Sequence, residues 1–139
     1  MTSKVFLLMI AIPLMALFTK LGWDEYQQTR AAAQVAHVQA IFREIRQIPG
    51  AEAVGGTSIS VNEYSTALWR RYKANIKCLE FRPHFDSEAL RQGFDFSKEY
   101  PSHGGLAVEY RNTEFEIRVL CSPADDGYSF SVNWSGLDR

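Results

Sequence analysis

The chain has 139 residues, with 15 lysines and arginines against 16 aspartates and glutamates, so its formal net charge is −1. Nucleic-acid binding, which relies on a strongly basic surface, gains no support from this balance. We find no internal repeat, and the only biased tract is a short run of three alanines.

The chain begins with a segment typical of a membrane address. Met1 and Lys4 precede an uncharged apolar run over residues 5–18. This length suits a signal peptide and is short for a spanning helix. The residues after the run lack the small residues at alternate positions that signal peptidase requires, and no cysteine before Cys78 could carry a lipid. We therefore expect residues 1–23 to form an uncleaved signal-anchor helix, with a cleaved signal peptide as the alternative.

The anchor predicts a topology. Lys20 follows the run but is offset by two acidic residues, and signal-like insertion leaves the amino terminus inside. We expect a single-pass protein of the inner (cytoplasmic) membrane whose residues 24–139 form one extracytoplasmic or periplasmic domain. That part has the length of an ordinary domain and carries 13 basic and 16 acidic residues.

The first part of the domain shows helical periodicity over residues 24–48. Apolar residues recur with a 4-3-4-3 spacing at Ala31, Val35, Val38, Phe42 and Ile45. Pro49 and Gly50 end the pattern. We expect one amphipathic helix that packs on the domain core, its first two turns forming a stalk. A coiled coil would show the same periodicity.

The middle of the chain predicts a loop, a strand and a second helix. Residues 51–62 are rich in glycine and small polar residues and indicate a loop with one short strand at most. Residues 65–72 follow as a strand, and residues 79–92 as a helix with Pro83 near its first turn and Gly93 just after its end. One face of that helix is apolar and should join the core: Phe81, Phe85 and Ala89.

The last third alternates apolar and polar residues, which predicts three half-buried antiparallel strands. The apolar positions are Leu106, Val108 and Tyr110, then Phe115, Ile117 and Val119, then Tyr128, Phe130, Val132 and Trp134. A further strand is expected over residues 95–98. The predicted fold is α+β, a two-layer domain with two helices packed on one face of an antiparallel meander sheet.

Two cysteines, Cys78 and Cys121, are the only thiols. In an oxidising compartment they predict a disulfide between the helix layer and the sheet, with two buried free thiols as the alternative. A nucleophilic Cys78 assisted by His84 is disfavoured, because no orienting group is visible.

The remaining polar residues form no catalytic, metal or cofactor motif. Glu80, His84 and Glu88 share one helix face and could present a metal site, but a solvated face explains them as well. The three histidines lie on separate elements. The outward positions of the predicted sheet carry charges of both signs that we interpret as a partner surface, with an ordinary solvent face as the alternative: Glu109, Glu114, Glu116 and Arg118.

Several stretches resemble a group of small membrane-anchored bacterial envelope proteins of uncharacterised function. The similarity lies in Ile48-Pro49-Gly50-Ala51, in Tyr72-Lys73, in the stretch from Phe81 to Phe94, and in the aromatic last strand from Tyr128 to Trp134. Phe85 and Phe94 replace the Tyr and Trp usual in that group. The resemblance implies export and a small α+β domain, and it implies no catalytic residue.

These observations favour a non-enzymatic, membrane-tethered domain that binds another protein of the bacterial envelope. Two alternatives stay open. One is a pseudopilin-like component of a secretion or pilus machine, although the acidic residue expected early in the apolar run is missing. The other is an envelope immunity or inhibitor protein.

Overall fold

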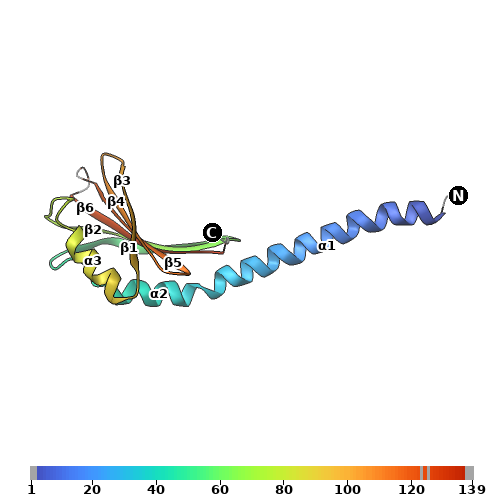
Figure 1. Cartoon of the computed structure of the whole chain (residues 1–139), viewed down its shortest axis with the longest axis horizontal. Coiled ribbons are helices and arrows are strands. Elements are labelled where there is room, and N and C mark those ends of the chain that lie inside the picture. Colours follow the sequence, from blue (N-terminus) through green and yellow to red (C-terminus); the bar gives the residue numbers. More distant parts are fainter. Residues whose placement is uncertain (1–2, 123, 125, 137–139) are drawn as a thin grey trace.

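The computed structural model describes residues 3–122, 124 and 126–136, with side chains from residue 12 onward, and it confirms an α+β fold (Figure 1). The helices are α1 (Ser3–Ala33), α2 (Val35–Glu44) and α3 (Arg82–Arg91). The strands are β1 (Glu52–Val61), β2 (Ser65–Lys73), β3 (Asp95–Ser102), β4 (Gly105–Arg111), β5 (Phe115–Ser122) and β6 (Gly127–Ser135). They form one antiparallel sheet in the order β1-β2-β6-β5-β4-β3.

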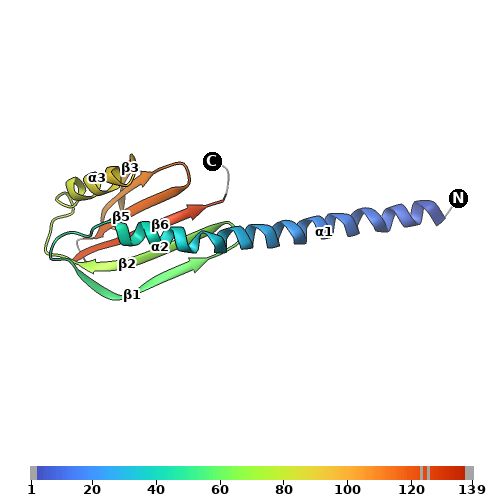
Figure 2. The same ribbon diagram turned by 90° about the horizontal axis from the view of Figure 1, so that it is seen from below.

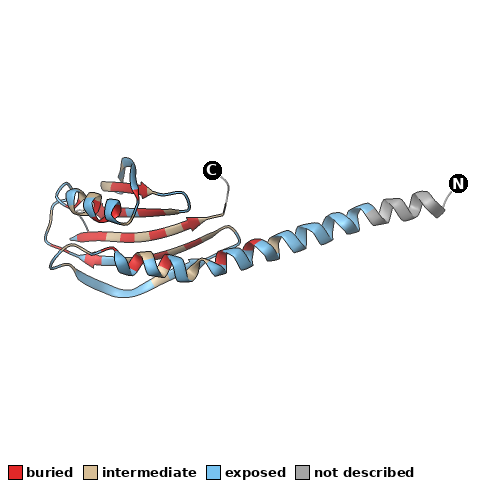
Figure 3. Cartoon of the chain, turned by 60° about the horizontal axis from the view of Figure 1, so that its bottom comes forward, coloured by how far each residue is buried: buried red, intermediate tan, exposed pale blue. Residues whose placement is uncertain are grey.

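The topology combines a meander with a separate hairpin. Strands β3 to β6 are consecutive neighbours, as the alternating pattern predicts, and the β1–β2 hairpin joins the sheet through pairing of β2 with β6. Helices α2 and α3 lie on the same face of this sheet (Figure 2). Residues alternate between buried and partly exposed along most of β6 (Figure 3).

Aromatic rings join the helices to the sheet. The ring centroid of Phe130 on β6 lies 5.1 Å from that of Phe42 on α2 and 5.8 Å from that of Phe85 on α3. Phe85 also meets Tyr128 edge-on at 5.5 Å. Burying such rings removes a large apolar area from water, so this cluster is the main link between the two layers.

Helix α1 projects away from the domain along the direction of β1 and β2, as both views show (Figures 1 and 2). It is continuous across residue 23, where the sequence predicts the end of an anchor. Its last turns dock on the domain: Gln27 and Ala31 are buried, and the Thr66 hydroxyl donates to the Ala31 carbonyl at 2.6 Å. Farther out the described apolar side chains are exposed: Ile12, Leu14, Met15, Leu17, Phe18, Leu21 and Trp23.

Within the described residues, no helix is both long and apolar enough to cross a membrane. The predicted membrane helix over residues 1–23 is therefore not supported by the structure. The first two residues of that prediction lie outside the described residues, as do the side chains up to residue 11.

The predicted helix over residues 24–48 differs from the structure at both ends. Its first part belongs to α1, a break occurs at Gln34, and α2 ends at Glu44. The chain from Ile45 onward is extended because tertiary hydrogen bonds hold it: the Ile48 N–H donates to the Tyr128 hydroxyl at 3.2 Å. Local periodicity cannot report a bond between residues so far apart in sequence.

The predicted loop over residues 51–62 is wrong, because this segment is the edge strand β1. Its glycines, which weaken strands, fall at an irregularity in the β1–β2 register between Val54 and Ser58, with Gly55 at a φ of +70°. Pairing with β2 on both sides of the irregularity sustains the strand. Strand β3 is likewise longer than the predicted 95–98, and α3 is shorter than the predicted 79–92.

Candidate functional site

A cluster of charged side chains lies on the sheet face opposite α2 and α3, across β3, β4 and β5. The register brings opposite charges together: Lys98 pairs with Glu109, Glu109 with Arg118, and Arg111 with Glu116. Cross-strand pairs of opposite sign stabilise a sheet, whereas like charges in these positions destabilise it. The pattern therefore stabilises the local strand order.

Glu109 is the centre of this cluster, and it is fully buried although it belongs to the helix-free face. Its carboxylate lies 3.0 Å from the Arg118 guanidinium and 3.2 Å from both Arg111 and Lys98, and it accepts a hydrogen bond from the Tyr100 hydroxyl at 2.7 Å. Burial raises the pKa of Glu109, but the Tyr100 hydrogen bond and the neighbouring cations outweigh burial and hold the pKa below its usual range.

Glu116 supplies the second carboxylate. It lies 2.7 Å from Arg111 and 3.0 Å from Arg118, so each arginine bridges both glutamates. In the ion pairs between described residues, the two carboxylates face three cations, Lys98, Arg111 and Arg118. The hydrogen bond to Glu109 raises the pKa of Tyr100 above its ordinary value, so the hydroxyl stays a donor to a higher pH than a free tyrosine does.

The structure brings together three of the four residues predicted as a partner surface. Arg118 contacts both Glu109 and Glu116. Glu114 instead lies in the turn between β4 and β5, where its N–H donates to the Asn112 side chain at 2.9 Å. Glu114 is exposed and does not belong to the cluster. Whether this face binds a partner stays a prediction.

Three members of the cluster were missed by sequence reasoning: Lys98, Tyr100 and Arg111. Arg111 carried a usable signal, because it lies two residues after Glu109 in the same strand and so shares its face. Lys98 and Tyr100 carried none, since their positions depend on the length and register of β3, including a shift between Phe96 and Lys98.

The predicted polar face of α3 forms hydrogen bonds with the backbone that follows α2. The His84 Nε2 donates to the Arg46 carbonyl at 2.8 Å, and the Glu88 carboxylate accepts from the Arg46 N–H at 3.0 Å. Arg91 donates to Glu88 at 2.7 Å, and this bond is the main cause of a lowered pKa for Glu88. Glu80 precedes α3 and binds the Lys77 N–H instead. These residues serve the fold, and no group of three His, Cys, Asp or Glu side chains among the described residues is placed to hold a metal ion.

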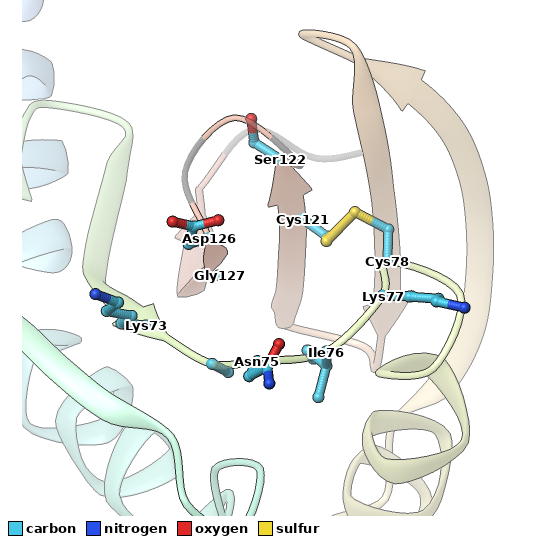
Figure 4. A pocket seen from close by; sticks show the side chains of 10 residues that line it. Lys73, Asn75, Ile76, Lys77, Cys78, Cys121, Ser122, Asp126 and Gly127 are labelled. Atoms are coloured by element: carbon cyan, nitrogen blue, oxygen red, sulfur yellow. A yellow bond between two sulfur atoms is a disulfide. The ribbon is translucent and has the colours of Figure 1, made fainter.

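The predicted disulfide between Cys78 and Cys121 is confirmed, and it ties the β2–α3 connection to β5. A sulfur in this bond is no free thiolate, so the nucleophile alternative for Cys78 fails. The bridge forms one wall of a cavity of about 540 Å³ (Figure 4). The side chains of Lys73 and Lys77 at its rim point away from one another (Figure 4), so their charges do not converge on a ligand.

In comparisons with known proteins, no family model, no curated protein and no solved structure matches this chain. The resemblance to small envelope proteins therefore stays a prediction. Function has to be inferred from the described geometry alone.

Proposed function

We propose that this protein is a membrane-tethered, extracytoplasmic domain that binds another protein of the bacterial envelope and performs no catalysis. The amino terminus lies on the cytoplasmic side of the inner membrane in this proposal, and the sheet domain lies outside. The supporting observation is α1. Its docked end fixes it to the domain, while its described apolar side chains before residue 24 are exposed and need a nonpolar environment.

The exposed part of α1 includes the end of the apolar run over residues 5–18. Side chains described as exposed begin at Ile12, inside the apolar run over residues 5–18. The exposed fraction is 61% for Ile12 and 69% for Met15. Leaving so many large apolar groups in water is unfavourable at roughly 25 cal/mol per Å², so a bilayer or an apolar partner should cover them.

The tether is tested with the full chain expressed in a bacterial host. We expect the wild-type chain to stay in the membrane pellet after alkaline carbonate washing. Arginine near the centre of a membrane helix costs about 2.5–3.5 kcal/mol, so the double variant Ile12→Arg, Met15→Arg should move to the supernatant. Gln28→Arg, on the exposed polar part of α1, is the matched control and should pellet as wild type does. A soluble wild-type chain would overturn the tether.

Partner binding is tested by crosslinking the full chain in its native membrane and identifying captured proteins by mass spectrometry. One reproducible protein partner supports the proposal. A catalytic turnover that persists in the purified chain, with every partner removed, would contradict it.

A second candidate is a pseudopilin-like subunit, which the continuous helix α1 favours. One helix of 31 residues carries a sheet domain on its last turns, and over residues 12–23 it presents exposed apolar side chains that could pack against other copies. Filaments of the full chain seen by electron microscopy would favour this candidate over the adaptor.

A further inference from the structure

The two edges of the sheet differ sharply in how they are protected. At one edge, β3 carries Lys98 and Pro101 and has an irregular register near Phe96. A strand lysine, a proline and a bulge are common devices that prevent an edge strand from pairing with another chain. This edge is therefore poorly suited to accept a further strand.

Strand β1 at the other edge lacks these devices over most of its length. Glu52, its first residue, is its only charged residue, and it contains no proline. From Ser58 to Val61 its pairing with β2 is regular, and Ile59 and Val61 are 45% and 42% exposed. A regular, uncharged and partly apolar edge is a template for strand addition.

The backbone groups that an added strand would use can be assigned. The Asn62 N–H donates to the Ser65 carbonyl at 3.0 Å, so Asn62 directs its backbone groups toward β2. Direction alternates along an antiparallel strand. The N–H and C=O groups of Val61 and Ile59 therefore point away from β2, toward the open edge.

A basic hollow lies next to this edge on the helix-covered face. It has a volume of about 590 Å³ between α2 and the β1–β2 hairpin, with Phe42, Leu68 and Ile59 among its apolar lining. Arg43, Arg46 and Arg70 also line it, and none of the described residues of its lining is acidic. The Nε of Arg70 is buried and has no hydrogen-bond partner among the described residues. Successive side chains of a strand point to opposite faces, so every second side chain of an added strand would face this hollow, where the arginines favour acidic side chains.

The orientation of α1 argues against a second copy as the occupant. Helix α1 leaves the domain along the direction of β1 (Figure 2). Antiparallel pairing of β1 with β1 of another copy reverses one molecule relative to the other, which sends the two α1 helices in opposite directions. Both helices could not then enter one membrane.

We propose that β1 binds an extended segment of another envelope protein by strand addition, and that this segment alternates apolar with acidic side chains. Main-chain hydrogen bonds to Ile59 and Val61 supply affinity, and the basic hollow selects partner segments that carry acidic side chains. The proposal rests on the proposed function, since it names the chemistry of the partner that the tethered domain binds.

The test uses the full ¹⁵N-labelled chain in detergent micelles and synthetic peptides of about eight residues, a common strand length. One peptide alternates valine with glutamate, and its control alternates valine with lysine. We expect the acidic peptide to slow amide hydrogen exchange at Ile59 and Val61. We expect it to bind about tenfold more tightly than the basic one, because several exposed charge pairs change sign together.

Two variants separate the backbone from the charges. Val61→Pro removes an outward N–H and should weaken the acidic peptide about tenfold, whereas Val61→Ala keeps that N–H and should change little. Arg43→Glu on exposed α2 should lower the preference for the acidic peptide without touching β1. Lys77→Glu, an exposed charge reversal away from the hollow, is its control.

Absence of binding, equal affinity for both peptides, or protection confined to β3 amides would overturn the proposal. Slow amide hydrogen exchange at Val61 that appears without peptide and becomes slower with protein concentration would also overturn it. That result would show that β1 pairs with a second copy of this chain. A chain that pellets and captures a partner but ignores the acidic peptide refutes the strand addition alone. A chain that binds the peptide but does not pellet refutes the tether alone.

Discussion

Replacing the buried carboxylate of Glu109 by an amide should destabilise the domain and change how its stability depends on pH. Glu109→Gln keeps the size of the side chain and its ability to accept from Tyr100, but it removes the negative charge between three cations. Breaking a fully buried ion pair costs about 3–5 kcal/mol. Here the cations are partly hydrated, with Lys98, Arg111 and Arg118 exposed by 53%, 36% and 45%. We therefore expect a loss of about 2 kcal/mol.

The pH dependence gives this prediction a second readout. The pKa of Glu109 is lowered in the folded state, so its ionised form contributes stability above the unfolded pKa of about 4.3. That contribution is lost as the pH falls through the folded-state pKa. The stability difference between wild type and Glu109→Gln should therefore be full at neutral pH and shrink below about pH 4.

Urea unfolding followed by circular dichroism, repeated from neutral to acidic pH, measures both effects. Thermal unfolding at neutral pH should show the same loss as a Tm lower by about 8 °C for a domain of this size. Glu114→Gln in the exposed β4–β5 turn is the matched control, and it should stay within about 0.5 kcal/mol of wild type. Equal stability of the two variants, or a difference that does not shrink in acid, would refute the role assigned to the cluster.

Three further predictions concern the disulfide, Phe85 in the core and the buried hydroxyl of Tyr128. Reduction of the disulfide opens a covalent loop between cysteines 43 residues apart in sequence. By the chain-entropy model this should lower the free energy of unfolding by at most about 4 kcal/mol, measured as a lower urea midpoint in the presence of reductant. An unchanged midpoint would contradict this. Phe85→Ala should cost about 3–5 kcal/mol because its buried ring packs against four other rings. Leu90→Ala, which is exposed on the same helix, should be nearly neutral in the same unfolding assay. Burial raises the pKa of Tyr128 to about 12, so its neutral form contributes stability below about pH 10 that is lost toward the folded pKa. In a pH titration, tyrosine absorbance should show an ionisation step at about pH 12 that is missing from Tyr128→Phe. If Tyr128 instead ionises at about pH 10, as a free tyrosine does, its side chain is not buried.

The disulfide and the three carboxy-terminal strands were predictable because each rests on a local or compositional signal. Alternation from Leu106 to Trp134 has the period of a half-buried strand, which fixes which residues enter the core whatever the strand order is. The predicted strand over residues 65–72 shows the same period in the structure, because Leu68 and Tyr72 are buried and Trp69 is exposed.

Other features depended on contacts between distant parts of the chain. The end of α2 is decided by the hydroxyl of Tyr128 and by α3, which hold the backbone from Arg46 to Ile48. Strand β1 exists because β2 pairs with it across a glycine-containing irregularity. No periodicity marks either event.

The sequence alone determined the α+β class, the core faces and the disulfide. The side-chain period is a local property that does not depend on the order of strands in the sheet, and the two cysteines have no other cysteine to pair with. Only the tertiary structure decided the cluster around Glu109 and the open edge at β1. Both depend on strand register and sheet order, which pair residues that the sequence does not relate.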